Sequence, residues 1–301
     1  MGIPVIDFAR FRGNAEDKFR CADELGVVFR KDSGGMGFAS IVGHGVPDRL
    51  IQRAFGVMER VYVTDMTEEQ RLRYEFAEEG RQMGYTPRDT EYSKGHKKPN
   101  RMQFWHVNDP ASIVRNEFPH EVPEFGPTML ELHHTLKHQA ATPVLHALAM
   151  HLRRDPNFFV DWIQKGENLV RAIYYPALRG DENVERSGGH EDINLVTILV
   201  PATEPGLQVL GPDGEWIDAD NPPGSLIVNL GDMMQMHTFG ELKSTTHRVV
   251  NPGKPCPNRF SIPIFIHPEI TRPLVTAGAY KFRRLREINL LAPLEKYAID
   301  Y

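Results

Sequence analysis

The stretch that decides the fold class is residues 247–267, HRVVNPGKPCPNRFSIPIFIH. Its two ends read as short strands, His247 to Val250 and Arg259 to His267, and the turn-forming Asn251-Pro252-Gly253 follows the first of them. Four earlier runs have the same character and are again separated by turns: Val170 to Tyr175, Val196 to Val200, Gly206 to Leu210 and Leu226 to Leu230. Many short strands joined by Pro/Gly turns predict a β-sandwich or a β-barrel.

The chain before this β-rich region predicts a mixture of strands and helices. Short strands are expected from Ile3 to Phe8 and from Gly37 to Val42. A helix is expected to begin at Pro47, because proline is favoured in the first helical turn. A further short helix is expected over residues 67–76, with Thr67 as its cap.

The middle of the chain predicts an irregular segment followed by a long helix. Residues 80–127 are rich in Gly, Pro and polar side chains, with one expected strand from Met102 to Val107. Long irregular segments in compact domains are often functional, so this one is a candidate rim for a substrate site. The strongest helical pattern covers residues 128–153, where Pro143 predicts a kink. A last helix is expected over residues 278–295.

These elements predict a chain that packs as one unit with two regions. Residues 1–127 are expected to form an N-terminal α/β region that carries the rim segment. Residues 128–301 are expected to contain the long helix, a β core over residues 168–268 and the C-terminal helix. The predicted fold class is therefore mainly β with flanking helices.

Composition and charge argue against several classes of protein. Thirty-five basic and 40 acidic side chains give a mild net charge of −5, whereas nucleic-acid binding usually needs a concentrated basic face. No stretch approaches the ~20 apolar residues of a membrane-spanning helix, so no membrane partner is expected. Cys21 and Cys256 are the only cysteines, which predicts reduced thiols and a cytoplasmic location rather than a disulfide framework.

A metal-binding pattern lies at His190 and Asp192. Residues two apart in a strand project to the same face, so this imidazole and carboxylate can bind one ion, while Glu191 points away. His247, at the start of a later strand, is the candidate third ligand. Two histidines and one carboxylate are the facial triad of non-haem iron(II) oxygenases.

A candidate anchor for an organic acid lies on the last predicted strand. Arg259 and Ser261 share one face of it, while the apolar residues between and after them fill the other face. The planar guanidinium fork binds a carboxylate bidentately, and a hydroxyl can add a further hydrogen bond. This pair therefore predicts a site for the distal carboxylate of an oxoacid.

Taken together, these motifs resemble the 2-oxoglutarate/iron(II)-dependent dioxygenases, specifically the isopenicillin N synthase-like branch. The matching pieces are Ile3-Pro4-Val5-Ile6-Asp7, Gly37-Phe38, Gly43-His44-Gly45-Val46-Pro47, His190-Glu191-Asp192, Thr197-Ile198-Leu199, Gly206-Leu207-Gln208-Val209, Asn229-Leu230-Gly231-Asp232, Thr238, Gly240, Ser244, His247-Arg248-Val249 and Arg259-Phe260-Ser261. The similarity spans nearly the whole chain.

The resemblance implies a double-stranded β-helix (jelly-roll) core that holds Fe(II), uses 2-oxoglutarate as co-substrate and consumes O2. It also implies that Tyr175 donates a hydrogen bond to the oxoacid. The usual reaction is hydroxylation of a small organic substrate, with desaturation or cyclisation as variants. This chain has Ile173 where plant members usually have Asn, and His237, the competing candidate for a metal ligand, where the family has Trp.

Candidate substrate contacts lie mainly in the irregular segment. Asn100, Arg101, Gln103 and Trp105 are proposed because a polar strand in this half faces the metal in related enzymes. Met236 and Phe265 are candidate apolar walls, although packing in the core explains these side chains equally well. The sequence identifies neither the substrate nor the oligomeric state.

Three other functions remain open at this point. An oxoacid-independent iron oxidase, like isopenicillin N synthase itself, would use Arg259 and Ser261 for its substrate. A non-catalytic jelly-roll binding protein would not need its three metal ligands. A zinc hydrolase or isomerase would leave the Arg259–Ser261 pair without a purpose.

Overall fold

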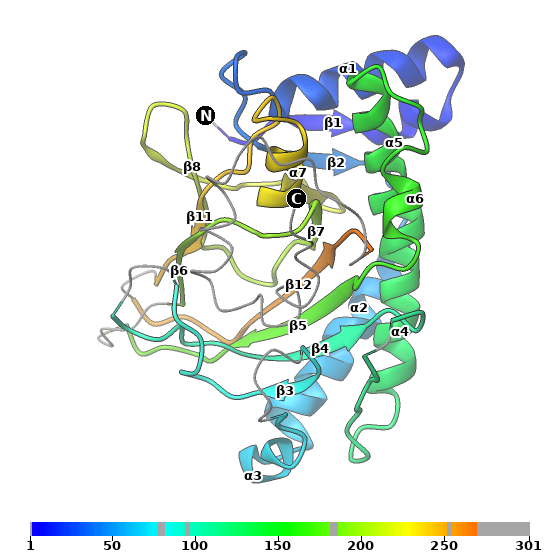
Figure 1. The fold of residues 1–301 in the computed structure, drawn as a ribbon. Helices are drawn as coiled ribbons and strands as arrows, with labels where there is room; N and C mark the ends of the chain where they lie inside the picture. Colours follow the sequence, from blue (N-terminus) through cyan, green and yellow to red (C-terminus); the bar gives the residue numbers. More distant parts are fainter. Residues whose placement is uncertain are drawn as a thin grey trace, which may run out of the picture.

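The computed structural model describes residues 2–76, 82–93, 97–112, 114–180, 186–251 and 254–269. Its strands form two sheets, one of eight strands and one of four, which together make the jelly-roll core (Figure 1). Helices flank the larger sheet, so the fold class is as predicted.

The larger sheet contains strands from both ends of the described chain. In spatial order its strands are β1 (Val5–Asp7), β2 (Phe38–Val42), β10 (Leu226–Leu230), β7 (Val196–Val200), β12 (Arg259–Ile266), β5 (Leu169–Tyr175), β4 (Gln103–Asn108) and β3 (Gly84–Thr86). The four central strands come from the β-rich half of the sequence, and the earlier part of the chain adds two strands to each side.

The smaller sheet positions two of the predicted metal ligands. In spatial order it contains β6 (Ser187–His190), β11 (His247–Val249), β8 (Leu207–Leu210) and β9 (Trp216–Asp218). The neighbouring strands β6 and β11 are antiparallel, and their register pairs His190 with His247.

Helices cover one side of the larger sheet in Figure 1. The helical elements are η1 (Phe8–Arg12), α1 (Ala15–Phe29), α2 (Asp48–Glu59), η2 (Arg60–Thr64), α3 (Glu68–Leu72), α4 (Phe125–Leu136), η3 (Lys137–Ala141), α5 (Thr142–His151), α6 (Val160–Ile163) and α7 (Asp232–His237). Thr67 caps α3 with a reciprocal capping box, as expected from the sequence. The predicted long helix begins three residues early, at Phe125.

The irregularity predicted at Pro143 is a π-helical turn that precedes it. The segment η3 joins α4 to α5 without a break in the helical backbone, and Pro143 lies in the first turn of α5. Proline lacks an N–H group and cannot donate to the preceding turn, so its effect appears on the N-terminal side.

The strands next to the helices are buried on both faces. Trp105 and Val107 of β4 belong to the main hydrophobic core together with the helices. Phe104 lies on the opposite face of β4 and packs with Ile173 and Tyr175 of β5. This second face is the interior of the jelly roll.

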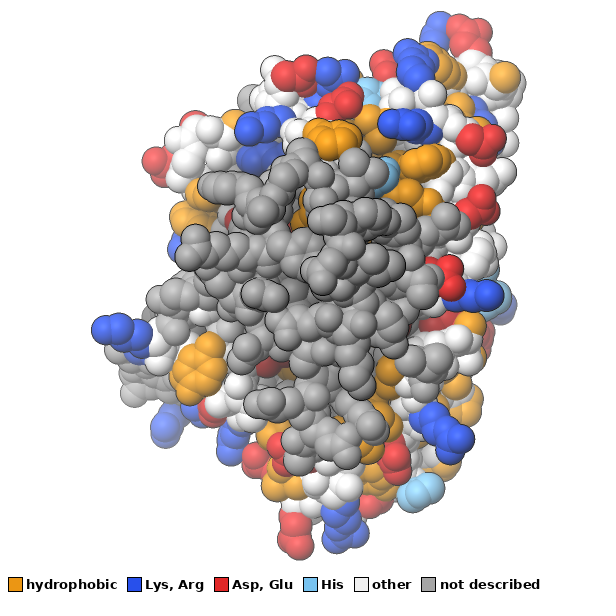
Figure 2. Space-filling view, viewed as in Figure 1, with side chains coloured by type: hydrophobic (Ala, Val, Ile, Leu, Met, Phe, Trp, Pro, Cys, Tyr) orange, Lys and Arg blue, Asp and Glu red, His pale blue; other side chains and the backbone are white. Residues whose placement is uncertain are grey.

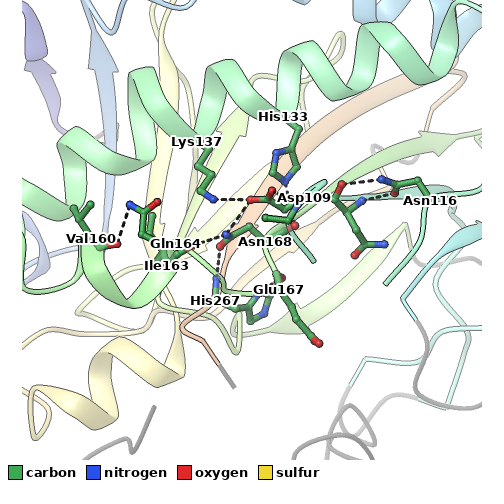
Figure 3. Close-up of polar contacts among 12 residues, drawn as sticks. Asp109, Asn116, His133, Lys137, Val160, Ile163, Gln164, Glu167, Asn168 and His267 are labelled. Carbon is green, nitrogen blue, oxygen red and sulfur yellow. Dashed lines mark hydrogen bonds and ion pairs between the residues drawn. The ribbon is translucent and has the colours of Figure 1, made fainter. Parts of the chain in front are cut away.

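A buried polar cluster ties β4 and β5 to the long helix (Figure 3). Lys137, the first residue of η3, donates to Asp109 Oδ2 at 2.6 Å, and both side chains are almost fully buried. Asn168 connects the pair to β12, because its Oδ1 accepts from the backbone N–H of His267 at 3.1 Å. The side-chain Nδ2 of Asn168 donates to the carbonyl of Ile163 at 2.9 Å.

The surface carries both signs of charge. Around the rim of the face in Figure 2, Lys/Arg and Asp/Glu side chains are interspersed. Among the described residues, no helix is long and apolar enough to cross a membrane. The helix predicted over residues 278–295 lies outside the described residues.

Candidate metal and oxoacid site

Three side chains converge where the two sheets approach each other. His190 ends β6, Asp192 follows it by two residues, and His247 begins β11. Asp192 Oδ1 lies 4.0 Å from His190 Nε2 and 3.8 Å from His247 Nε2, and the three ligand atoms all lie within 4.8 Å of one another. The structure thus brings together the three residues that the sequence predicted as metal ligands.

Both histidines use Nδ1 for a hydrogen bond to the backbone, so Nε2 is available to bind a metal ion. His190 Nδ1 lies 2.8 Å from the carbonyl oxygen of Gly188, and His247 Nδ1 lies 3.2 Å from that of Thr245. A carbonyl can only accept, so each Nδ1 carries a proton and donates it, and Nε2 is the nitrogen left for a metal ion. Both Nε2 atoms lie within 4.0 Å of Asp192 Oδ1.

Asp192 is held by two buried donors through its other oxygen. Its Oδ2 accepts from Thr197 Oγ1 at 2.5 Å and from Asn229 Nδ2 at 2.7 Å, and only 8% of the residue is exposed. Burial alone would raise its pKa, but the neighbouring histidines and these two hydrogen bonds outweigh burial and lower it. The carboxylate is therefore ionised and oriented with Oδ1 towards the imidazoles.

The set of donors fits iron(II). Two imidazoles and one carboxylate on one side of an ion leave other coordination positions open, as in a facial triad. Glu191, which lies between two of these residues, points elsewhere and accepts from Thr246 at 2.6 Å. The competing candidate His237 packs against Trp162 and Phe158 instead.

Arg259 presents a buried donor without an acceptor among the described residues. Its Nε donates to the carbonyls of Glu204 at 2.9 Å and Pro205 at 3.3 Å, which fixes the orientation of the guanidinium. Its Nη1 is buried and has no hydrogen-bond partner. Leaving a buried N–H group unpaired costs about 1–3 kcal/mol, so the position is built for an acceptor such as a carboxylate.

Tyr175 and Ser261 lie beside this guanidinium. The register pairs Arg259 with Tyr175, and the Arg259 Cζ atom lies 4.9 Å from the centre of the phenol ring. Burial raises the pKa of Tyr175, so its hydroxyl stays protonated and can donate. Ser261 is buried two residues further along β12, opposite Ile173.

A second arginine, Arg171 of β5, forms a side-chain cluster that the sequence analysis did not predict. Arg171 lies on the same face as Tyr175, and its guanidinium carbon is 4.1 Å from the ring centre of Phe104 and 5.5 Å from that of Phe265. Its Nε donates to His106 Nε2 at 3.0 Å, and its Nη1 pairs with Glu91 at 3.2 Å. Burial, and secondarily the Arg171 charge, lower the pKa of His106, so the imidazole is a neutral acceptor.

The predicted substrate residues fall in different places. Phe265 faces the interior, because it pairs with Thr197 and lies near Arg171. Asn100 accepts from the backbone N–H of Gly188, which ties the irregular segment to β6. Met236 is buried in α7, and Arg101 pairs with Asp89 at 3.8 Å.

Trp105 and Gln103 lie on the helix side of β4. Trp105 is fully buried among Tyr74, Tyr85 and Phe125, and its indole N–H donates to a backbone carbonyl. Gln103 accepts from Tyr85 at 2.6 Å. His106 faces the interior of the jelly roll, whereas Trp105 faces the helices. Because both faces of β4 are buried, the sequence does not show which residues point to which face.

Two family models match the chain. The model described as the 2OG-Fe(II) oxygenase superfamily matches residues 166–268. The model described as the non-haem dioxygenase in morphine synthesis N-terminal region matches residues 3–128. The first match contains all three triad residues and Arg259.

Relatives and solved structures of the same superfamily are also similar to this chain. A 2-oxoglutarate-Fe(II) type oxidoreductase from Emericella nidulans is 28% identical over 280 residues, which are 87% of this chain and 78% of that protein. A solved structure of a putative 2OG-Fe(II) oxygenase family protein from Caulobacter crescentus is 30% identical with a TM-score of 0.78, covering 95% of this chain and 99% of that one. The fold is also similar to that of a full-length protein from Neurospora crassa solved in complex with alpha-KG, with a TM-score of 0.80 at 23% identity and coverage of 94% of this chain and 95% of that one.

Proposed function

Because the chain belongs to the 2OG-Fe(II) oxygenase superfamily, we propose that His190, Asp192 and His247 hold its iron(II) ion and that Arg259 anchors its 2-oxoglutarate. The observation that carries the oxoacid assignment is the buried Arg259 Nη1, which lacks an acceptor among the described residues. Tyr175 and Ser261 would add hydrogen bonds to the same carboxylate.

In a hydroxylation, the side chains of this site would orient the metal ligand Asp192 and the oxoacid anchor Arg259. When bound, iron(II) and 2-oxoglutarate supply the oxidising chemistry: O2 oxidises a substrate C–H to C–OH, and the oxoacid leaves as succinate and carbon dioxide. Thr197 and Asn229 keep Asp192 ionised and directed at the ion. Glu204 and Pro205 hold Arg259 by their carbonyls, so the oxoacid binds in one orientation.

We also propose that the Arg171 cluster lines the substrate side of the site. Arg171 and Phe265 face the interior next to Thr197, which contacts Asp192 directly. His106 and Glu91 fix the guanidinium from two directions. These residues replace Gln103 and Trp105 as proposed contacts for a small organic substrate.

The cellular location stays a prediction. Cys21 and Cys256 are both free thiols.

An anaerobic titration tests the proposed function. Apoprotein receives iron(II) and then 2-oxoglutarate, and the visible charge-transfer band of the chelate is followed. A band that disappears when oxygen is admitted, with succinate formed, would support the proposal. Iron binding without a band would move Arg259 to a substrate role in an oxoacid-independent oxidase, and no iron binding would refute the proposal.

Replacing Arg259 by glutamine is expected to raise the Kd of 2-oxoglutarate by about 100-fold. Loss of one member of a buried charge pair costs roughly 2–5 kcal/mol, and about 2.7 kcal/mol corresponds to a factor of 100. Iron affinity should change little, because Arg259 does not contact the triad. Arg248→Gln is the matched control, since Arg248 on β11 stacks on Trp216 and binds Gln208. Equal weakening in both variants would contradict the assignment.

A further inference from the structure

Arg186 is a buried arginine that no sequence motif singled out. It immediately precedes β6 and is only 2% exposed. Its Nη2 donates to Cys256 Sγ at 3.0 Å and more weakly to the carbonyl of Pro257 at 3.4 Å. Among the described residues, its buried Nε has no hydrogen-bond partner and no carboxylate forms an ion pair with it.

The side chain of Arg186 lies next to the proposed oxoacid anchor. Its guanidinium carbon is 5.9 Å from the centre of the Tyr175 ring, and that of Arg259 is 4.9 Å from the same centre. Cys256 and Pro257, which it contacts, lead directly into Arg259.

Two buried positive charges therefore flank one phenol ring, and neither has a carboxylate partner among the described residues. Burying a charge without a counter-charge is unfavourable, and two like charges close together add repulsion. Such an arrangement becomes favourable when an anion binds between or beside them. Clamping the segment 256–257 does not explain it, since a thiol is a weak acceptor and Nε would still lack a partner.

We propose that Arg186 supplies a second positive charge for the distal carboxylate of 2-oxoglutarate. The proposal rests on the proposed function, in which Arg259 binds the same carboxylate. One end of the oxoacid chelates the metal, so only the far carboxylate reaches the Tyr175 ring that both arginines flank. Arg186 then determines selectivity for dicarboxylic oxoacids over monocarboxylic oxoacids that have the same chelating group.

The test compares two oxoacids that differ in the distal carboxylate. Anaerobic iron(II) protein is titrated with 2-oxoglutarate and with 2-oxobutanoate, and Kd is obtained from the visible band and from calorimetry. In Arg186→Gln, the Kd of 2-oxoglutarate should rise at least about tenfold, as expected for loss of a hydrogen bond to a charged group. The Kd of 2-oxobutanoate should change less than about twofold, because that acid has no group to lose contact with Arg186. Arg186→Lys should restore most of the preference.

Several outcomes separate this proposal from its rivals. If Arg186→Gln weakens both oxoacids equally, Arg186 only supports the structure, and if it weakens neither, the proposal is wrong. Arg248→Gln controls for loss of an arginine from the same barrel, and Arg186→Met replaces the glutamine variant if that variant does not fold. Wild-type protein that binds iron but gives no band with 2-oxoglutarate would refute the proposed function itself, rather than only the role of Arg186.

Discussion

Replacing Asp192 by alanine is expected to eliminate 2-oxoglutarate-dependent succinate formation and to weaken iron binding strongly. The loss should exceed the ~10–100-fold that follows when residues around a metal ligand are changed, because the ligand itself is removed. Asp192 Oδ1 lies within 4.0 Å of both histidine Nε2 atoms, and no other carboxylate of the described residues joins that cluster. Iron affinity by calorimetry and succinate by chromatography measure the two effects.

A graded series makes this result specific. Thr197→Val and Asn229→Ala each remove one hydrogen bond to Asp192 Oδ2 and should lower activity by about 10–100-fold. Glu191→Gln is the matched control, since Glu191 binds Thr246 and should leave turnover near the wild-type value. Full turnover in Asp192→Ala would show that the proposed metal site is wrong.

Replacing Lys137 by methionine is expected to lower the free energy of unfolding by about 3–5 kcal/mol, the cost of removing one partner of a buried ion pair. Lys137 and Asp109 are both almost fully buried and 2.6 Å apart (Figure 3). The methionine fills most of the same volume, so the effect reports the uncompensated Asp109 charge. Denaturant unfolding at pH 7.5 measures it.

The pH dependence of this variant has a definite sign. In the wild-type protein, burial opposes ionisation of Asp109, but the Lys137 hydrogen bond, the backbone N–H of Ala111 and the Lys137 charge outweigh it and lower the pKa. Without Lys137, we expect burial to outweigh the remaining Ala111 hydrogen bond and to raise the pKa of Asp109 above its value in the unfolded chain. A raised pKa of an acid costs stability as pH rises through it, so the destabilisation should be smaller at pH 5.5 than at pH 7.5.

The double variant Lys137→Met/Asp109→Asn separates the buried charge from packing. It removes the charge together with its partner and should be more stable than Lys137→Met alone. If the double variant is less stable than Lys137→Met, the loss in the single variant comes from packing rather than from the buried charge. Equal stability losses of Lys137→Met at both pH values would lead to the same conclusion.

Most strands could be predicted from the sequence because their residues are β-branched or alternate. Three strands were missed for local reasons. β6 contains Gly188 and Gly189, which read as a turn, while β3 and β9 are only three residues long. Their pairing partners, rather than their own residues, make them strands.

The residues of the candidate site that could be predicted from the sequence are those that form a short motif. Arg259 and Ser261 are two residues apart within β12, so strand alternation brings them to one face. His190 and Asp192 are also two residues apart, but β6 ends at His190, so the irregular segment after the strand positions Asp192. Arg171 and Arg186 carry no such pattern. Each becomes notable only in the tertiary structure, where Arg186 is buried and Arg171 is partly buried near Tyr175. Trp105 shows the converse, because an aromatic residue on a strand buried on both faces gives no sign of which side it occupies.

The order of strands in the larger sheet has a consequence for biosynthesis. β1 and β2 lie at one side of that sheet, and β3 and β4 lie at the other. These four leave the ribosome before the central strands are made, and Ile41 of β2 must wait for Leu226 of β10. Contacts so distant in sequence close slowly, and two-stranded ribbons are barely stable alone. β1 and β2 can pair with each other, but they lack their partner β10 until most of the chain has been made, so we expect this side of the larger sheet to form late.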